Sequence, residues 1–489
     1  MAQTAMISLA GIRGIVGETL KAEDVLRYGL AFGTMIGGGR VVVGRDTRPS
    51  GEMIRDVICG ALLSTGCEVF DLGIAPTATI GLMVSETEAR GGIAITASHN
   101  PLEWNGLKFF RHDGILQRTA DQARLLEICR SGRFKRARIA RPARVVRLEI
   151  GSGVHVEKVV RSMDGRTIRR RSFRVVVDCC NGAGAVVLPT LLEALGCKVT
   201  TLFGDVRRAF ERAGEPLPEN LSALSRQVCR EKADMGFAVD PDADRLAIVD
   251  ENGRPLGEER TVTLAAYHVL QRQRTPVVVN LSTTRAIDDV GQICGVRICR
   301  TRVGEAYVVE GMRRHRAAIG GEGNGGVIWP KIVSSRDSCS AVGLLLEALA
   351  EADEPVSVYN RRVPDYVVLK KRLPTERSRL RGVFSRLERR FGRMGRIWRA
   401  DGLRIDLPRG WFHLRPSGTE PIVRLFVEAP TQEEAEALAS EVSAFFCNPW
   451  RLCVLVVNSS HAEARRWSAM SEEQGKGHAE FRAGFVAIA

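Results

Sequence analysis

The sequence predicts a multidomain α/β protein that ends in an α+β module, and three features indicate this. The chain has 489 residues, which is more than one hydrophobic core usually supports, so we expect three or four domains. Short runs of valine, each followed by a polar turn and a stretch with helical spacing, occur three times at about the spacing of a domain. From residue 366 onward the pattern changes to short strand-like runs and amphipathic stretches.

The three valine runs are residues 41–43, 175–177 and 277–279. Such runs, when they end in a polar turn, are typical of strands that are buried on both faces of a sheet. Loops at the carboxyl ends of these strands are available for ligands. The sequence therefore predicts one α/β unit used three times.

The carboxyl-terminal part has a different organisation. Residues 366–369 are strand-like, residues 376–391 predict a charged amphipathic helix, and Thr431 with Glu434 forms a capping-box pattern before a second helix. Residues 447–489 contain one β-prone run and then a polar stretch without clear periodicity. We expect this tail to be weakly ordered.

The composition predicts a soluble globular protein of the cytoplasm. Hydrophobic residues make up 44% and charged residues 26% of the chain, which is enough apolar material for packed cores. No apolar run approaches the roughly 20 residues that cross a bilayer, and the first residues lack the pattern of a signal peptide. The 12 cysteines include no CxxC pair, so we expect most to be small buried hydrophobes.

The net charge of +14 is carried mainly by arginine and can reflect nucleic acid, acidic lipid, an anionic small substrate or a solvated surface. The densest runs are residues 130–147, 161–171 and 379–399. Nucleic acid is one candidate partner, but no aromatic residues are interleaved to stack on bases. A solvated arginine-rich surface would also carry such a charge, and so would a site for an anionic small substrate.

A cluster of carboxylates points to a metal ion. Asp240, Asp242 and Asp244 stand at every second position after the apolar run 235–239, so in extended backbone they share a face and can converge on one hard cation such as Mg²⁺. An EF-hand loop would need glycine at its sixth position, where Arg245 stands. The plain alternative is an acidic surface turn.

A second motif places a nucleophile after a strand. Ser98 and His99 follow the apolar run 92–95, and the Asn100-Pro101 pair favours a tight turn. The G-x-S-x-G pattern of serine hydrolases is absent. The alternative is an ordinary capped turn.

Two further loops have the chemistry of ligand binding. Residues 415–421 combine Arg415, two hydroxyls and a glycine, which suits a phosphate but lacks the lysine of a Walker loop. Residues 320–326 place Glu322 and Asn324 among glycines, and a carboxylate with an amide suits sugar hydroxyls. Ordinary polar and glycine turns are the alternatives. Arg13 between two glycines is a weak signal by itself.

Taken together and in this order, these stretches resemble the α-D-phosphohexomutase family, whose members interconvert hexose 1- and 6-phosphates. The resemblance extends over about residues 5 to 446 and also includes Lys108 in the Asn-Gly-Leu-Lys stretch. It implies three similar α/β/α domains with mixed sheets plus a C-terminal α+β domain around a central cleft. The expected boundaries are 1–148, 149–252, 253–364 and 365–446, followed by the tail 447–489.

The resemblance also implies a role for each motif. Ser98 would carry the phosphoryl group and complete the coordination of Mg²⁺ held by the three aspartates. The catalytic residues would be Lys108, Arg13, His99 and Arg245. Lys108 would act as general acid or base, and Arg13 and Arg245 would stabilise charge at the reacting phosphate. The residues that would bind the sugar and the distal phosphate are Glu322, Asn324, Arg415, Ser417, Gly418 and Thr419.

The implied substrate is a hexose phosphate, with a hexose 1,6-bisphosphate intermediate that a basic cleft would retain, and part of the +14 charge then follows without nucleic acid. Residues 303–308 are more similar to the phosphoglucosamine mutase branch, so glucosamine phosphate is favoured over mannose or glucose phosphate. Residues 320–326, the expected sugar loop, lack the family's usual serine and histidine, and Ser338 replaces a common glycine.

A non-catalytic sugar-phosphate binding protein is a second hypothesis. We expect no membrane or nucleic-acid partner and either a monomer or a homodimer.

Overall fold

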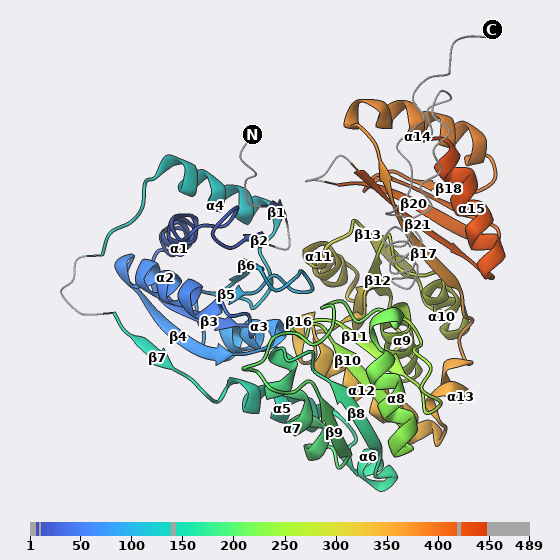
Figure 1. Cartoon of the computed structure of the whole chain (residues 1–489), viewed down its shortest axis with the longest axis horizontal. Coiled ribbons are helices and arrows are strands. Elements are labelled where there is room, and N and C mark those ends of the chain that lie inside the picture. The colour runs from blue at the N-terminus through green and yellow to red at the C-terminus, as the bar shows by residue number, and fades with distance from the viewer. Residues whose placement is uncertain (1–5, 9–10, 138–142, 418–421, 447–489) are drawn as a thin grey trace, which may run out of the picture. The chain divides into compact units, whose positions relative to one another are not determined.

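The computed structural model describes residues 6–8, 11–137, 143–417 and 422–446, and these contain four β-sheets with flanking helices. Figure 1 shows the helices packed around each sheet. The described elements up to Phe445 belong to one compact unit. The tail, for which the sequence predicts weak order, lies outside the described residues.

The first sheet has seven strands in the order β1-β2-β6-β5-β3-β4-β7. Its centre is the first valine run, since β3 pairs in parallel with both β4 and β5, and β6 then pairs antiparallel with β5. Its strands are β1 (Met6–Ser8), β2 (Gly11–Ile15), β3 (Gly39–Arg45), β4 (Cys67–Ile74), β5 (Gly91–Ile95), β6 (Trp104–Arg111) and β7 (Val145–Arg147). Its helices are α1 (Ala22–Ile36), α2 (Gly51–Ser64), α3 (Thr77–Glu86) and α4 (Thr119–Ser131).

The second sheet repeats this arrangement in the order β11-β10-β8-β9. The second valine run forms β8, which is parallel to β9 and β10, and β11 pairs antiparallel with β10. Its strands are β8 (Arg174–Asp178), β9 (Lys198–Leu202), β10 (Met235–Val239) and β11 (Leu246–Val249). Its helices are α5 (Gly151–Ser162), α6 (Gly165–Arg171), η1 (Ala183–Val186), α7 (Leu188–Ala194), η2 (Pro218–Asn220) and α8 (Ser222–Glu231).

The third sheet has the same pairing around the third valine run and one added strand, in the order β13-β12-β14-β15-β16. Strand β12 is parallel to β13 and β14, and β15 returns antiparallel to β14. Its strands are β12 (Val277–Asn280), β13 (Ile298–Thr301), β14 (Ile319–Glu322), β15 (Gly326–Trp329) and β16 (Val333–Arg336). Its helices are α9 (Glu259–Arg272), α10 (Ala286–Cys294), α11 (Glu305–His315), α12 (Ser338–Ala352) and α13 (Val356–Asn360).

The valine runs are buried on both faces, as predicted, because helices cover both sides of the three sheets that contain them. Val41 and Val43 pack with residues of α1, α2 and α4, whereas Val42 packs with residues of α3 on the opposite face. In the second sheet Val176 packs with α8, and its two valine neighbours pack with α5 and α7. The prediction of one α/β unit used three times is therefore confirmed.

The fourth sheet is antiparallel, in the order β17-β21-β20-β19-β18, and makes the predicted α+β module. Helix α15 begins where the capping pattern predicts, with the Thr431 hydroxyl accepting from the Glu434 backbone. The Phe391 ring contacts Phe412 of the sheet and Phe445 after α15, so both helices share one core. The elements are β17 (Val367–Pro374), α14 (Arg377–Phe391), β18 (Arg396–Trp398), β19 (Leu403–Leu407), β20 (Gly410–Pro416), β21 (Ile422–Ala429) and α15 (Gln432–Ala444).

Two other predictions concern the surface and the cysteines. The arginines of the 379–399 run are exposed, so this part of the positive charge is a solvated surface. Of the ten described cysteines seven are buried, as the sequence predicts. Among the described residues no helix combines the length and the apolar character needed to cross a membrane.

Candidate active site

The predicted motifs occupy equivalent loops of the repeated unit. In each of the first three sheets a loop joins the third strand of the unit to the antiparallel fourth strand. The β5–β6 loop carries Ser98, the β10–β11 loop carries the three aspartates, and the β14–β15 loop carries Asn324 just after Glu322. The third strand runs parallel to its neighbour, so each loop lies at the carboxyl edge of a sheet, where α/β proteins bind ligands.

Ser98 is fully buried and is held in a strained backbone conformation. Its φ of 53° lies in the left-handed region, which costs free energy for a residue with a Cβ atom and persists only when the surroundings enforce it. Its backbone N–H donates to Thr96 Oγ1 at 2.8 Å, and its carbonyl accepts from Arg48 at 2.7 Å. These bonds fix the hydroxyl, which donates to Asp240 Oδ2 at 2.9 Å.

A buried ion pair holds the β5–β6 loop that carries Ser98, here called the serine loop, in place. The Arg48 and Asp46 side chains are both fully buried, and Arg48 Nε lies 3.1 Å from Asp46 Oδ2. Thr96 donates to the same carboxylate at 2.6 Å, and Arg48 also donates to the carbonyls of Ser98 and Asn100. One arginine side chain therefore binds at least two backbone carbonyls of the serine loop and fixes its conformation.

The three aspartates converge, but the reason predicted from the sequence was wrong. Residues 240–245 form a turn rather than extended backbone, with Ala243 at a φ of 52°. Asp240 Oδ1 accepts from the backbone N–H groups of Asp244 and Arg245, at 3.0 and 3.1 Å. The turn folds around the first carboxylate, so one oxygen from each aspartate lies within 4.8 Å of the others.

Lys108 of β6 lies against this acidic turn. Its Nζ donates to Asp242 Oδ2 at 2.6 Å and to Asp244 Oδ2 at 2.9 Å. Burial opposes the charged form of all three groups, but nearby opposite charges outweigh it. The two carboxylates raise the pKa of Lys108, Lys108 lowers the pKa of Asp242, and Arg336 together with Lys108 lowers the pKa of Asp244. Burial together with the two neighbouring carboxylates raises the pKa of Asp240 well above its ordinary value.

The remaining predicted catalytic residues lie beside the acidic turn or the loop that carries Ser98. Arg245 Nε lies 3.9 Å from Asp240 Oδ2, and the guanidinium also pairs with Glu215. Arg13 of β2 donates to Asn100 Oδ1 at 2.9 Å, beside the serine loop. His99 Nδ1 lies 3.3 Å from Ser98 Oγ, and burial with the nearby arginines lowers its pKa well below the ordinary value. His99 is therefore neutral at pH 7.

The predicted sugar loop is connected to the aspartates through Arg336 of β16. This guanidinium donates to Asp244 Oδ2 at 2.6 Å, to Glu322 Oε2 at 2.8 Å and to Glu305 Oε2 at 3.1 Å. Glu322 also accepts from Asn280 Nδ2 at 2.8 Å, so both of its oxygens are engaged. Asn324 is half-buried and accepts from the backbone of its own loop.

The predicted phosphate loop follows β20 in the fourth sheet. Arg415 Nε lies 2.8 Å from Asp401 Oδ2, and the same oxygen accepts from the Val303 backbone in the third domain. Ser417 is buried just after the strand. Gly418 and Thr419 lie outside the described residues. The contacts therefore join the serine loop directly to residues 240–245, the metal loop, whereas Arg415 is held beside the third domain by Asp401.

Family models match each of the four domains in turn. The alpha/beta/alpha domain I of phosphoglucomutase/phosphomannomutase matches residues 7–136, domain II matches 154–253 and domain III matches 258–366. The C-terminal domain of the same family matches residues 359–445. The chain belongs to the phosphoglucomutase/phosphomannomutase family.

Whole-chain relatives agree with this family assignment. A "Phosphoglucomutase/phosphomannomutase" of Thermococcus kodakarensis is 37% identical over 87% of this chain and 94% of its own length. A "Probable phosphoglucosamine mutase" of Methanopyrus kandleri is 36% identical over 91% of this chain and 97% of its own. The crystal structure of a phosphoglucomutase/phosphomannomutase family protein of Burkholderia thailandensis, 26% identical, superposes with a TM-score of 0.78 over 90% of this chain and 97% of its own.

The acidic turn of this family member fits a divalent cation. Asp242 Oδ1 and Asp244 Oδ1 are buried and have no hydrogen-bond partner among the described residues. Buried carboxylate oxygens without a partner are costly, and a metal ion is one group that would satisfy them. All the available ligands are hard oxygen atoms, the donors that Mg²⁺ prefers.

Sequence reasoning missed four supporting groups. Arg336 and the Asp46–Arg48 pair had no assigned role, although Asp46 follows a valine run at the edge where ligands bind. Thr77, at the start of α3, donates to Asp242 Oδ2 at 2.6 Å and had no sequence signal. Ser338, noted only as a departure from the family, donates to the carbonyls of Ala243 and Arg245 and so clamps the metal loop.

Proposed function

We propose that this chain interconverts hexose 6-phosphates and hexose 1-phosphates through a phosphoserine at Ser98 and a hexose bisphosphate. The observation that carries the proposal is the hydrogen bond of 2.9 Å from the Ser98 hydroxyl to Asp240, between a nucleophile and a cation site that come from different sheets. Phosphoryl transfer depends mainly on positioning and on cancelling charge, and this arrangement supplies both.

The transfer has two halves. In the first, the bond between phosphorus and Ser98 Oγ breaks, and a bond forms from phosphorus to the free hydroxyl of the sugar monophosphate. The resulting bisphosphate turns end for end. In the second, Ser98 Oγ attacks the other phosphate, and the sugar oxygen on that side is released. The enzyme regains its phosphoryl group, and the product differs from the substrate only in the position of the phosphate.

Two side chains move the protons in this proposal. In the second half neutral His99, 3.3 Å from Ser98 Oγ, takes the serine proton, and Lys108 gives a proton to the released sugar oxygen. In the first half of the next turnover Lys108 takes the proton of the attacking sugar hydroxyl, and His99 returns its proton to Ser98 Oγ. The contacts with Asp242 and Asp244 keep Lys108 protonated in the structure, which is the form that the second half requires.

The charge of the moving phosphoryl group needs cations on several sides. Mg²⁺, held by Asp240, Asp242 and Asp244 together with the phosphate on Ser98, would cancel charge on the phosphoryl oxygens. Arg13 and Arg245 would add positive charge from two other directions. The phosphate that does not react would be held by Arg415, Ser417, Gly418 and Thr419.

We propose glucosamine 6-phosphate as the preferred substrate, with conversion to glucosamine 1-phosphate. The names of several relatives at 36% identity and the similarity of residues 303–308 to the phosphoglucosamine mutase branch support this choice. The name of the Thermococcus kodakarensis relative favours mannose and glucose phosphates as the alternative. We further propose a cytoplasmic enzyme that is a monomer or a homodimer.

Relative turnover decides between the two substrate classes. The test measures kcat/KM on the 6-phosphates of glucosamine, mannose and glucose with the same enzyme preparation. The proposal predicts the highest value for glucosamine 6-phosphate. A higher value for either neutral sugar would overturn the substrate assignment, and no turnover of any of the three would overturn the function.

A further inference from the structure

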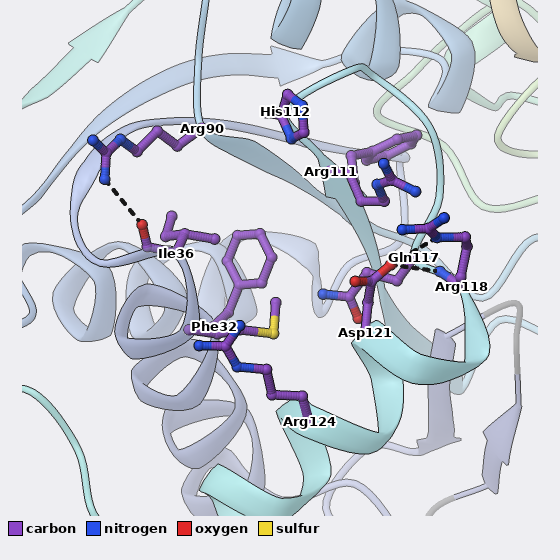
Figure 2. Close-up of a pocket in the computed structure, with 11 residues that line it drawn as sticks. Phe32, Ile36, Arg90, Arg111, His112, Gln117, Arg118, Asp121 and Arg124 are labelled. Atoms are coloured by element: carbon purple, nitrogen blue, oxygen red, sulfur yellow. Dashed lines mark hydrogen bonds and ion pairs between the residues drawn. The ribbon is translucent and has the colours of Figure 1, made fainter.

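A second concave site lies within the first domain, away from the serine loop. It is a pocket of about 440 Å³ between α1, α4 and the end of β6, which is within the usual size of small-molecule sites. Figure 2 shows the pocket, with Phe32 and Ile36 on one side and Gln117, Arg118 and Asp121 on the other. The reaction proposed above uses none of the residues that line it.

Gln117 is the unexplained group in this pocket. The residue is only 5% exposed, yet neither Oε1 nor Nε2 of its side chain has a hydrogen-bond partner among the described residues. A tight hairpin fixes its position, because the Gln117 backbone donates to the Phe109 carbonyl at 2.9 Å and Phe110 pairs with Leu116. A buried amide without partners is costly, so this position favours a group that offers both an acceptor and a donor.

The wall of the pocket is strongly basic. It contains four arginines and one aspartate, Asp121, and these five side chains together carry a formal charge of +3. Two of these arginines are paired, Arg111 with Asp113 and Arg118 with Asp121. The Arg90 guanidinium donates to the Ile36 carbonyl, and neither it nor the exposed Arg124 has an ion pair within the described part of the chain. Two cations are therefore available to an anion.

The pocket also has an apolar wall beside its polar groups. Met35 and Ile36 at the end of α1 are half-buried, and the fully buried Phe32 and Phe110 also line the pocket. The flat face of a heterocyclic ring can pack against this wall while the polar edge of the ring faces Gln117. The combination of an apolar wall, an amide with a free donor and acceptor, and two unpaired cations is suited to a base that carries phosphates.

This pocket and the serine loop lie at opposite ends of the same two strands. Ser98 follows the carboxyl end of β5, whereas Arg90 precedes its first residue, and Arg111 ends β6 opposite Gly91. The length of β5 separates the two sites by on the order of 15 Å. A molecule bound in the pocket would therefore not occupy the Ser98 site.

We propose that this pocket binds a nucleoside diphosphate. The edge of the base, which offers a donor beside an acceptor, pairs with the Gln117 amide, and the phosphates lie at Arg90 and Arg124. Binding adds no covalent step and is independent of mutase turnover. The site is therefore a non-catalytic ligand site on the phosphoserine-bearing domain.

Calorimetric titration of the full chain with uridine diphosphate tests this assignment, with inorganic pyrophosphate as the probe that lacks a base. The expected result is one site that binds the nucleotide at least tenfold more tightly than pyrophosphate. Arg124→Gln and Gln117→Leu should each weaken nucleotide binding at least tenfold, whereas Arg130→Gln, an exposed arginine on the same helix, should not. Equal binding of the two probes would overturn the proposal, as would nucleotide affinity unchanged in either pocket variant.

Two controls separate the pocket from the active site and from misfolding. Nucleotide affinity should be unchanged in Arg415→Ala, so a parallel loss there would place the ligand in the active site and overturn the proposal. Gln117→Leu removes an unpartnered amide and should melt at the same or a higher temperature than wild type. Mutase activity of this variant should equal that of wild type, and a loss of activity together with binding would contradict a separate site.

Discussion

The hydroxyl of Ser98 donates to Asp240 Oδ2 at 2.9 Å, although the two residues stand 142 positions apart and follow strands of different sheets. Both residues occupy the loop between the third and fourth strands of the repeated unit. The repeat thus places a nucleophile from one copy against a carboxylate from the next. Asp244, Arg336 and Glu322 continue the contact to the third copy.

Replacing Asp240 tests the cation site without changing the size of the side chain. Asp240→Asn keeps an oxygen that can accept from Ser98 but removes a charged ligand. We expect kcat to fall by about 10²–10³-fold, the usual effect of losing one preorganised electrostatic group. Steady-state kinetics across a Mg²⁺ titration measures this, and wild-type kcat at saturating Mg²⁺ would contradict the role of Asp240.

Removing Arg48 tests the buried support of the serine loop. Arg48→Ala leaves Asp46 buried without its partner, so we expect a loss of about 3–5 kcal/mol in the free energy of unfolding. Arg399→Ala is the matched control, because that arginine pairs with Glu388 at the surface and should contribute less than about 1 kcal/mol. Urea unfolding measures the free energy of unfolding of both variants. Similar losses of this free energy would contradict a special role for the buried pair.

Arg336 is predicted to position the metal loop and the sugar loop together. Arg336→Lys keeps the charge but cannot contact Asp244, Glu305 and Glu322 at once, so kcat/KM should fall about 10–100-fold. Arg260→Lys is the control, because Arg260 is equally buried but donates to residues 360–364. It should lower the melting temperature while leaving kcat/KM near wild type, and equal kinetic losses would refute the positioning role.

His413 makes the stability of the fourth domain depend on pH. Burial lowers its pKa to about 4, while its Nδ1 lies 3.0 Å from Ser282 Oγ and its Nε2 lies 2.6 Å from the Asp401 carbonyl. The unfolded chain takes up a proton near pH 6.5 and the folded chain does not, so stability is full above pH 6.5 and falls as the pH drops toward 4.

A variant isolates this effect from other titrating groups. Between pH 7 and pH 5 the wild type should lose about 2 kcal/mol more than His413→Gln in urea unfolding. The same loss in both proteins would show that His413 does not cause the dependence.

The sequence predicts most of the fold because its signals are local. Runs of valine favour strands that helices cover on both faces of the sheet, and the capping pattern at Thr431 fixes the start of α15. The loop residues Ser98, Asp240, Asp242 and Asp244 are recognisable because each follows a buried strand.

The supporting groups are not recognisable in this way, because their function depends on contacts between distant segments. Arg336 has no local pattern and acts on three carboxylates from three different elements. The convergence of the aspartates rests on a turn with Ala243 in the left-handed region, whereas the prediction from the sequence assumed extended backbone. Gln117 has the pattern of an ordinary polar residue until the hairpin buries it.

The central claim is that Ser98 carries the phosphoryl group. Incubation of the enzyme with glucose 1,6-bisphosphate labelled with ³²P, followed by peptide mapping, tests it most directly. The account predicts label on the peptide that contains Ser98, with neither label nor turnover in Ser98→Ala. Wild-type turnover in Ser98→Ala, or label on another residue, would contradict it.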